Sequence, residues 1–156
     1  MKRYDAIIKS PIGPIGILAS GDSIARIELA VQAGREQLPP GGVAADAARA
    51  LDAWFSGGPW PEGIALLEQG TPFQQRVWRL LRSIRPGTAL TYGEVARRLG
   101  SGPRAVGQAC RSNPCPLLTP CHRVISASGT GGFSGRSAGE WPRMKEWLLR
   151  HEGFLS

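Results

Sequence analysis

A cysteine followed directly by a histidine, Cys121-His122, is the pair of residues in this sequence best suited to nucleophilic chemistry. A thiolate rather than a thiol attacks electrophilic carbon, so a reactive cysteine needs a neighbour that removes its proton. His122 is the nearest base, and a bridging water would connect the two groups if their side chains point apart. The residues alone also allow a simpler interpretation, because an unpaired cysteine is most often a small buried hydrophobic residue.

The segment that leads into this pair is stiff. Three prolines between positions 114 and 120 exclude a helix and restrict the backbone, which would fix the direction of Cys121. The other two cysteines, Cys110 and Cys115, have no neighbouring base and are predicted to pack in the core. An odd number of cysteines argues against a disulfide framework, and finger-like pairs of Cys and His are missing, so we expect no metal site.

The charge of the chain is concentrated in its second half. Residues 1–70 carry six basic and eight acidic side chains, whereas residues 71–156 carry thirteen basic and four acidic ones, and the whole chain has a net charge of +7. Twelve of the thirteen are arginines, whose guanidinium groups suit phosphate oxygens, so this half is predicted to bind nucleic acid. A genome that favours arginine codons would give the same excess without any such function.

The pattern of the first 68 residues predicts a small α/β domain. Short apolar runs at 4–10, 15–20 and 24–30 are separated by Pro/Gly turns and favour strands. An Ala-rich stretch, 44–55, has its large apolar residues at helical spacing and ends at two glycines, which favours a helix.

Residues 69–156 are predicted to form a second, mostly helical domain. A capping box begins one helix at Thr71 and another at Thr91, and the second helix continues through Leu99. After a Gly-rich turn, Pro103 opens a third helix that runs to about Ser112. Two short helices around a tight turn are the outline of a helix-turn-helix, although an αα-hairpin that only packs has the same pattern.

The resemblance of this half to a known family is specific. Five motifs follow one another over residues 71–156, and they resemble the O6-alkylguanine-DNA alkyltransferases, also called methylated-DNA–protein-cysteine methyltransferases: TPFQQRVW, TYGEVA, RAVGQA, PCHRV and EWLLRHEG. Residues 4–30 are similar to the family's N-terminal unit more loosely. The resemblance implies an α+β protein, with a ribonuclease-H-like sheet and helix before the helix-turn-helix domain.

The resemblance also implies roles for the residues of the reactive segment. Cys121 would accept the alkyl group, His122 would act as its base through a water, and Glu152 would orient His122, in the manner of a catalytic triad. Asn113 would brace the turn between the recognition helix and the site. From the residues alone, Glu152 is predicted to be a solvated charge at the end of a helix.

Further residues would hold the substrate. A damaged base is out of reach inside a stacked duplex and must be extruded from it. By resemblance, Tyr92 drives the rotation and donates to guanine N3, while the backbone of Cys121 and Val124 holds the exocyclic amine. The amide of Ser134 meets O6, and Phe133 stacks where the family more often has tyrosine.

The resemblance places DNA in contact with the helix-turn-helix through the minor groove, with an arginine of the second helix filling the gap in the base stack. That finger is Arg104. The other residues expected to contact DNA are Thr91, Tyr92, Ala105, Gly107 and Arg111. Departures from the family pattern are a shorter turn before Pro103, a shorter Gly-rich loop and an addition at residues 136–141, and they leave the accepted alkyl size open.

The composition predicts a cytoplasmic protein without membrane contact. The resemblance implies that it repairs double-stranded DNA bearing alkylated guanine, as a monomer and without a cofactor. Cooperative binding to DNA and activity on O4-alkylthymine stay open. Three other functions remain to be separated from repair: a lesion sensor that binds without transfer, a cysteine hydrolase that ignores DNA, and a helix-turn-helix regulator with a preferred sequence.

Overall fold

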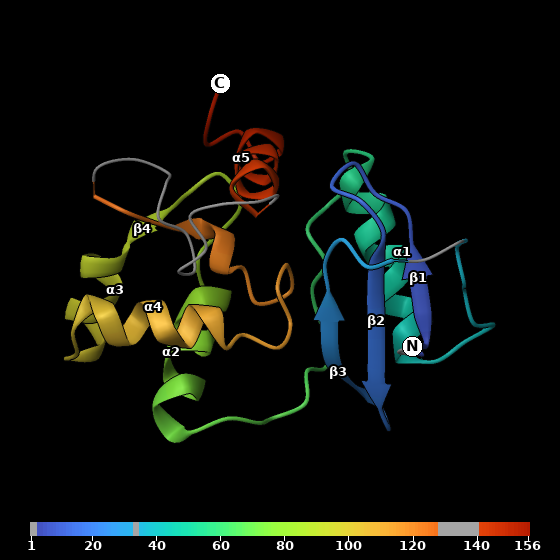
Figure 1. Ribbon diagram of the computed structural model, residues 1–156, viewed down its shortest axis with the longest axis horizontal. Helices are drawn as coiled ribbons and strands as arrows, with labels where there is room; N and C mark the ends of the chain where they lie inside the picture. The colour runs from blue at the N-terminus through green and yellow to red at the C-terminus, as the bar shows by residue number, and fades with distance from the viewer. Residues whose placement is uncertain (1–2, 33–34, 128–140) are drawn as a thin grey trace. The chain divides into compact units, whose positions relative to one another are not determined.

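The computed structural model describes residues 3–32, 35–127 and 141–156, which belong to two units, Met1–Glu68 and Gln69–Ser156 (Figure 1). Each unit has its own elements and its own core. A three-stranded antiparallel sheet in the first unit and a set of helices in the second give the α+β class that the sequence predicts.

The first unit consists of a small sheet with one helix on it. The strands β1 (Ala6–Ile8), β2 (Ile15–Ser20) and β3 (Ser23–Glu28) lie in that order, and each pairs antiparallel with the next. The helix α1 (Val43–Phe55) packs against all three strands. Because side chains alternate between the faces of a strand, Ile15 and Ile17 of β2 point to the same face, and both are fully buried. The buried apolar residues of this unit include Ile15, Ile17, Ile24, Ile27, Ala44, Ala48, Leu51 and Trp54.

One glycine of β2 lies under an aromatic ring. A Cβ atom on Gly16 would stand 2.5 Å from ring carbons of Tyr4, closer than any real Cβ contact. The hydroxyl of Tyr4 donates to Oε1 of Glu28 at 2.6 Å, which fixes the ring over the sheet. Glycine at position 16 is therefore required by the close approach of Tyr4.

The second unit is built from short helices and two very short strands. These elements are α2 (Pro72–Arg82), β4 (Leu90–Thr91), α3 (Tyr92–Leu99), α4 (Pro103–Arg111), the 3-10 turn η1 (Cys121–Arg123), β5 (Val124–Ile125) and α5 (Trp141–His151).

Both predicted capping boxes are present. The Thr71 hydroxyl accepts from the Gln74 amide at 3.1 Å, and the Gln74 side chain accepts from the Thr71 amide at 2.9 Å. Thr91 and Glu94 make the same reciprocal pair at 3.0 and 2.9 Å. These bonds satisfy donors that a helix start leaves without an intrahelical partner, and they explain why α2 and α3 begin where they do.

The helices α3 and α4 form the predicted helix-turn-helix. Gly100 ends α3 in the left-handed conformation, with φ of +65°, which glycine adopts without steric cost. Pro103 is the first residue of α4, a position where its missing N–H costs nothing. The indole of Trp78 on α2 donates to the carbonyl of Ala109 at 2.9 Å and thereby attaches α4 to α2.

A parallel pair of two-residue strands joins the helix-turn-helix to the reactive segment. Leu90 pairs with Val124 and Thr91 with Ile125. The start of α3 is therefore fixed directly beside the residues that follow Cys121. The local sequence gives no sign of this pairing, because two residues are too few to show a strand pattern.

Candidate active site

A network of hydrogen bonds around Asn113 shapes the segment before the reactive pair. The Asn113 amide nitrogen donates to the carbonyl of Thr119 at 2.8 Å, and its oxygen accepts from the Cys115 amide at 2.9 Å. The Cys121 amide donates to the same Thr119 carbonyl at 2.8 Å. Asn113 therefore braces the turn that leads to Cys121, in the place where the resemblance puts a bracing asparagine.

The Cys121-His122 pair lies inside the protein. Cys121 is 2% exposed and His122 is 1% exposed, and both belong to the tight turn η1. Since solvent hardly reaches the thiol, a substrate carbon must enter the protein to meet it. Cys110 and Cys115 are buried as well, as predicted, and burial raises the pKa of the Cys110 thiol.

Glu152, just after α5, contacts His122 across thirty residues of sequence. Its Oε2 atom lies 3.0 Å from Nε2 of His122, and its side chain is fully buried. The prediction from the residues alone, a solvated charge at a helix end, is therefore wrong. The packing of α5 against η1 removes the Glu152 carboxylate from water. No local sequence pattern predicts this packing.

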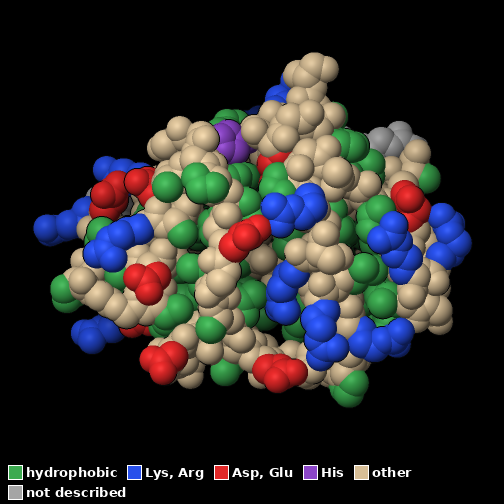
Figure 2. Space-filling model, turned by 180° about the vertical axis from the view of Figure 1, so that it is seen from behind, with side chains coloured by type: hydrophobic (Ala, Val, Ile, Leu, Met, Phe, Trp, Pro, Cys, Tyr) green, Lys and Arg blue, Asp and Glu red, His purple; other side chains and the backbone are tan. Residues whose placement is uncertain are grey.

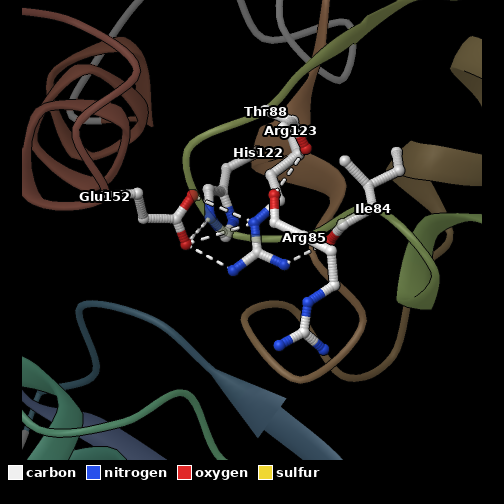
Figure 3. Close-up of polar contacts among 6 residues, drawn as sticks. All are labelled: Ile84, Arg85, Thr88, His122, Arg123 and Glu152. Atoms are coloured by element: carbon white, nitrogen blue, oxygen red, sulfur yellow. Dashed lines mark hydrogen bonds and ion pairs between the residues drawn. The ribbon is translucent and has the colours of Figure 1, made fainter.

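Arg123 is the third member of this cluster, and sequence reasoning gave it no role. Its guanidinium binds both oxygens of Glu152, through Nε at 3.0 and 3.1 Å and through one terminal nitrogen (Figure 3). The other terminal nitrogen donates to the carbonyl of Ile84 at 2.7 Å. Only 1% of Arg123 is exposed. Its place in the PCHRV motif, beside two site residues, was the one available signal.

The charges of the cluster act on one another. Burial by itself would raise the pKa of Glu152, but hydrogen bonds from His122 and Arg123 outweigh burial and lower the pKa to about 2. Burial lowers the pKa of His122, and the hydrogen bond and charge of Glu152 only partly oppose this effect. At neutral pH the cluster therefore holds an ionised carboxylate beside a neutral imidazole.

A second buried cation, Lys145 on α5, was also missed. Its Nζ donates to the carbonyl of Val124 at 2.7 Å, and 1% of the residue is exposed. Burial lowers the pKa of Lys145 to about 7, against the opposing influence of the Cys121 and Cys110 thiols. Helical spacing would have predicted its burial, because Lys145 lies on the same face of α5 as Trp141 and Leu149.

The structure brings together some of the predicted substrate residues. Val124 is buried in β5, directly after η1. Tyr92 begins α3, and its ring lies 4.0 Å from the position that a Cβ on Gly107 of α4 would take. Phe133 and Ser134 lie outside the described residues.

Three of the four predicted DNA-contacting residues of α4 share one face, while Ala105 lies about 100° around the helix from Arg104. Arg104, Gly107 and Arg111 are spaced three and four residues apart, and both arginines are exposed. Lys and Arg side chains are prominent on the surface shown in Figure 2. The exposed arginines of the second unit include Arg76, Arg79, Arg85, Arg97, Arg98, Arg104, Arg111, Arg143 and Arg150.

Within the described ranges, no three His, Cys, Asp or Glu side chains are grouped as metal ligands would be. Nor does any helix there have the length and apolar character that a membrane span requires.

Comparisons with known proteins agree on one family. Residues 72–154 match the model of the 6-O-methylguanine DNA methyltransferase DNA-binding domain. A methylated-DNA–protein-cysteine methyltransferase of Methanosarcina acetivorans is 36% identical over 96% of this chain and 98% of the relative. One from Shigella flexneri is 50% identical, over 55% of this chain and 49% of the relative.

Solved structures give the same result. The Mycobacterium tuberculosis OGT in complex with DNA is 36% identical to this chain, with a TM-score of 0.77 over 94% of this chain and 91% of that one. An O6-methylguanine DNA methyltransferase from Methanococcus jannaschii is 26% identical, with a TM-score of 0.69 over 96% and 94%. This chain belongs to the methylated-DNA–protein-cysteine methyltransferase family.

Proposed function

We propose that this protein repairs DNA by moving the alkyl group of an O6-alkylguanine onto the sulfur of Cys121, once per molecule. The observation that carries the proposal is the cluster at η1: a buried thiol, followed by a neutral imidazole that is hydrogen-bonded to a buried, ionised carboxylate. In a chain of this family, such a cluster suits attack by sulfur on carbon better than any other chemistry.

The transfer exchanges one bond for another. His122, through a water, takes the thiol proton, and the sulfur electron pair attacks the alkyl carbon, forming the S–C bond of a thioether. The C–O6 bond breaks, and its electrons remain on the departing guanine. Tyr92 and the amide of Ser134 donate hydrogen bonds to N3 and O6, which stabilises that developing charge. The departing guanine anion takes up one proton, which in the net balance is the proton released by the thiol. The products are therefore neutral guanine and an alkylated cysteine, and no group in the proposed site breaks a thioether.

Because Cys121 is buried, the damaged base would have to leave the DNA duplex and enter the protein to reach it. Inside, the backbone of Cys121 and Val124 would hold the exocyclic amine of guanine. A carbonyl oxygen has two lone pairs, so the Val124 carbonyl can bind Lys145 and this amine together. Phe133 would stack on the purine.

The second unit would bind the DNA, with α4 in the minor groove. The exposed Arg104, in the first turn of α4, would fill the space that the extruded base leaves. Small residues beside it, Ala105 and Gly107, would let the helix backbone approach the sugars, while Thr91 and Arg111 contact phosphates. We expect the protein to act as a monomer in the cytoplasm.

Intact-mass measurement tests the transfer. After incubation with a duplex that contains O6-methylguanine, the protein should gain the mass of one methylene, and the gain should map to Cys121. Cys121→Ala should bind the same duplex and gain no mass, while Cys110→Ala should still react. Stable binding by the unmodified protein without any mass gain would contradict transfer and indicate a lesion sensor.

Comparing two substrates tests the role of Arg104. Arg104→Ala should slow the reaction with a methylated duplex at least about 10-fold, yet leave the reaction with free O6-benzylguanine unchanged, because a free base needs no extrusion. Arg150→Ala removes an equal charge from α5 and serves as the matched control. If both substrates react more slowly with Arg104→Ala, the finger assignment is wrong.

A further inference from the structure

We propose that Arg123 is a positioning residue for the alkyl transfer, whose guanidinium holds the Glu152 carboxylate against Nε2 of His122 and so keeps Nδ1 of His122 as the proton acceptor. This inference rests on the proposed function and adds a residue to it.

The geometry shows a clamp rather than a single ion pair. One edge of the planar Arg123 guanidinium donates hydrogen bonds to both carboxylate oxygens of Glu152 (Figure 3). The opposite edge donates to the carbonyl of Ile84, which follows α2. A guanidinium held at both edges has little freedom to turn. The position of the Glu152 carboxylate after α5 is therefore set by η1 and by the end of α2.

The clamp decides which nitrogen of His122 carries the hydrogen. An ionised carboxylate only accepts hydrogen bonds, so the contact between Oε2 of Glu152 and Nε2 of His122 requires a hydrogen on Nε2. A neutral imidazole carries one hydrogen, and Nδ1 is then the acceptor. A base that takes the thiol proton, directly or through a water, needs this bare nitrogen.

Loss of Arg123 would remove that arrangement in either of two ways. A fully buried carboxylate without its arginine attracts a proton. If His122 takes the proton, both ring nitrogens are blocked. If Glu152 takes it, Glu152 donates to Nε2, and the ring hydrogen moves to Nδ1. In both cases His122 no longer accepts a proton at Nδ1.

The charges that surround His122 give the direction of the pH effect. Burial and the positive charges of Arg123 and Lys145 lower the pKa of His122, while Glu152 raises it. Removing the Arg123 charge should therefore raise the pKa of His122. The rate of transfer should then reach its plateau at a higher pH, because the neutral ring forms later in the titration.

The unmodified protein provides the first test. Ring nitrogen-15 shifts distinguish the two neutral tautomers from the imidazolium, and a His151→Gln variant assigns the signals of the two histidines. At pH 7 to 8 we expect His122 to be neutral with the hydrogen on Nε2. A hydrogen on Nδ1, or an imidazolium at this pH, would overturn the proposal without any Arg123 variant.

Two Arg123 variants provide the second test, with single-turnover rates on O6-benzylguanine measured across pH. Arg123→Met should lower the rate at pH 7 by about 10- to 100-fold, as loss of a partner that orients a site histidine commonly does, and should move the acidic limb upward by about one pH unit. Arg123→Lys keeps the positive charge but cannot bind both oxygens of Glu152 from one planar group. Its transfer rate should therefore fall, while the acidic limb of its pH–rate profile stays near that of the unmodified protein. Arg85→Met removes a neighbouring exposed arginine and should change neither quantity.

An acidic limb in Arg123→Met that matches the unmodified protein would overturn the proposal, since a merely structural role would lower the rate without moving the limb. If Arg123→Met does not fold, Arg123→Lys and the tautomer measurement decide the matter. Failure of the proposed function itself is distinguishable, because it would appear as an absence of mass gain at Cys121 in the unmodified protein.

Discussion

Among the described residues, the buried side chains of the first unit are all apolar, whereas the second unit also buries Thr119, His122, Arg123 and Lys145. The two units contain the same kinds of short element, so the contrast lies in what their cores hold. Isoleucine, alanine and leucine fill the space between α1 and its sheet. In the second unit, charged side chains are buried around His122, the residue that follows Cys121.

The difference indicates what each core is for. Apolar burial stabilises a fold, while taking charges out of water is costly and seldom repaid in stability. A carboxylate, a guanidinium and an ammonium buried near one cysteine are therefore poorly explained by folding alone. The proposed reaction, which needs a fixed base, accounts for them. The described part of the first unit buries no such group, and changes there should affect stability without affecting chemistry.

The largest effect should follow Glu152→Gln. It should lower the rate of methyl transfer by about 100-fold or more, because the amide no longer holds His122 as a base. It should also lower the free energy of unfolding by about 3–5 kcal/mol, because the Arg123 charge stays buried without its carboxylate. Single-turnover kinetics and urea denaturation measure the two quantities. If the destabilised variant transfers methyl groups as fast as the unmodified protein, Glu152 has no role in the transfer step.

In the first unit, Leu51→Ala should act on stability alone. Leu51 is fully buried between α1 and the sheet, so we expect a loss of about 2–5 kcal/mol in the free energy of unfolding. The folded protein should transfer methyl groups at the normal rate. Asp52→Ala, an exposed neighbour on the same helix, serves as the control, with a change within about 0.5 kcal/mol. A slower rate in the folded Leu51 variant would break the contrast between the units.

The lowered pKa of Lys145 should make the free energy of unfolding depend on pH. Its pKa is about 7 in the folded protein and near 10.5 in the unfolded chain, so between these values the unfolded chain binds more protons. Stability should therefore rise with pH across this window, by at most about 1.4 kcal/mol per pH unit, and be lost as the pH falls toward 7. Comparing the protein with Lys145→Met by urea denaturation isolates this contribution from the titration of the cysteines. Parallel curves for the two proteins would show that Lys145 titrates normally.

A smaller effect should follow Gly16→Ala in the first unit. The new methyl group would push the Tyr4 ring away and break its hydrogen bond to Glu28, at a cost of about 1 kcal/mol. Gly41→Ala is the matched control for added volume, since nothing lies within 4 Å of a Cβ there and its backbone is not in the left-handed region. The rate of transfer should be unchanged in both. A stability of Gly16→Ala equal to that of the unmodified protein would mean that Tyr4 moves freely.

Much of the fold was predictable because it depends on local interactions. The capping boxes at Thr71 and Thr91 join residues three apart, and Pro103 fits a helix start by its own geometry. The apolar run at 15–20 and the alternation at 24–30 predicted the strands β2 and β3. The β4–β5 pair was not predictable, because residues 90 and 124 meet only after the chain has folded.

The candidate site also contains residues that the sequence indicated and residues that only the structure revealed. The order of residues made Cys121 a candidate nucleophile with a candidate base beside it, and the resemblance of the motifs pointed to Glu152 and Asn113. The sequence did not show that Arg123 is buried, because an arginine is almost never fully buried unless it is paired. Helical spacing indicates the burial of Lys145, but not its contact with the distant Val124 carbonyl.

The sequence by itself determined where the helices begin, which cysteine has a histidine beside it and which half of the chain is basic, because these properties lie in neighbouring residues. Only the tertiary structure decided which charged side chains are buried and which groups they bind. The carboxylate of Glu152 meets His122 and Arg123 across about thirty residues, and the carbonyl of Val124 meets Lys145 across twenty-one. Whether a charge is solvated or paired depends on these distant contacts, since burial is a property of the packed chain and not of any segment.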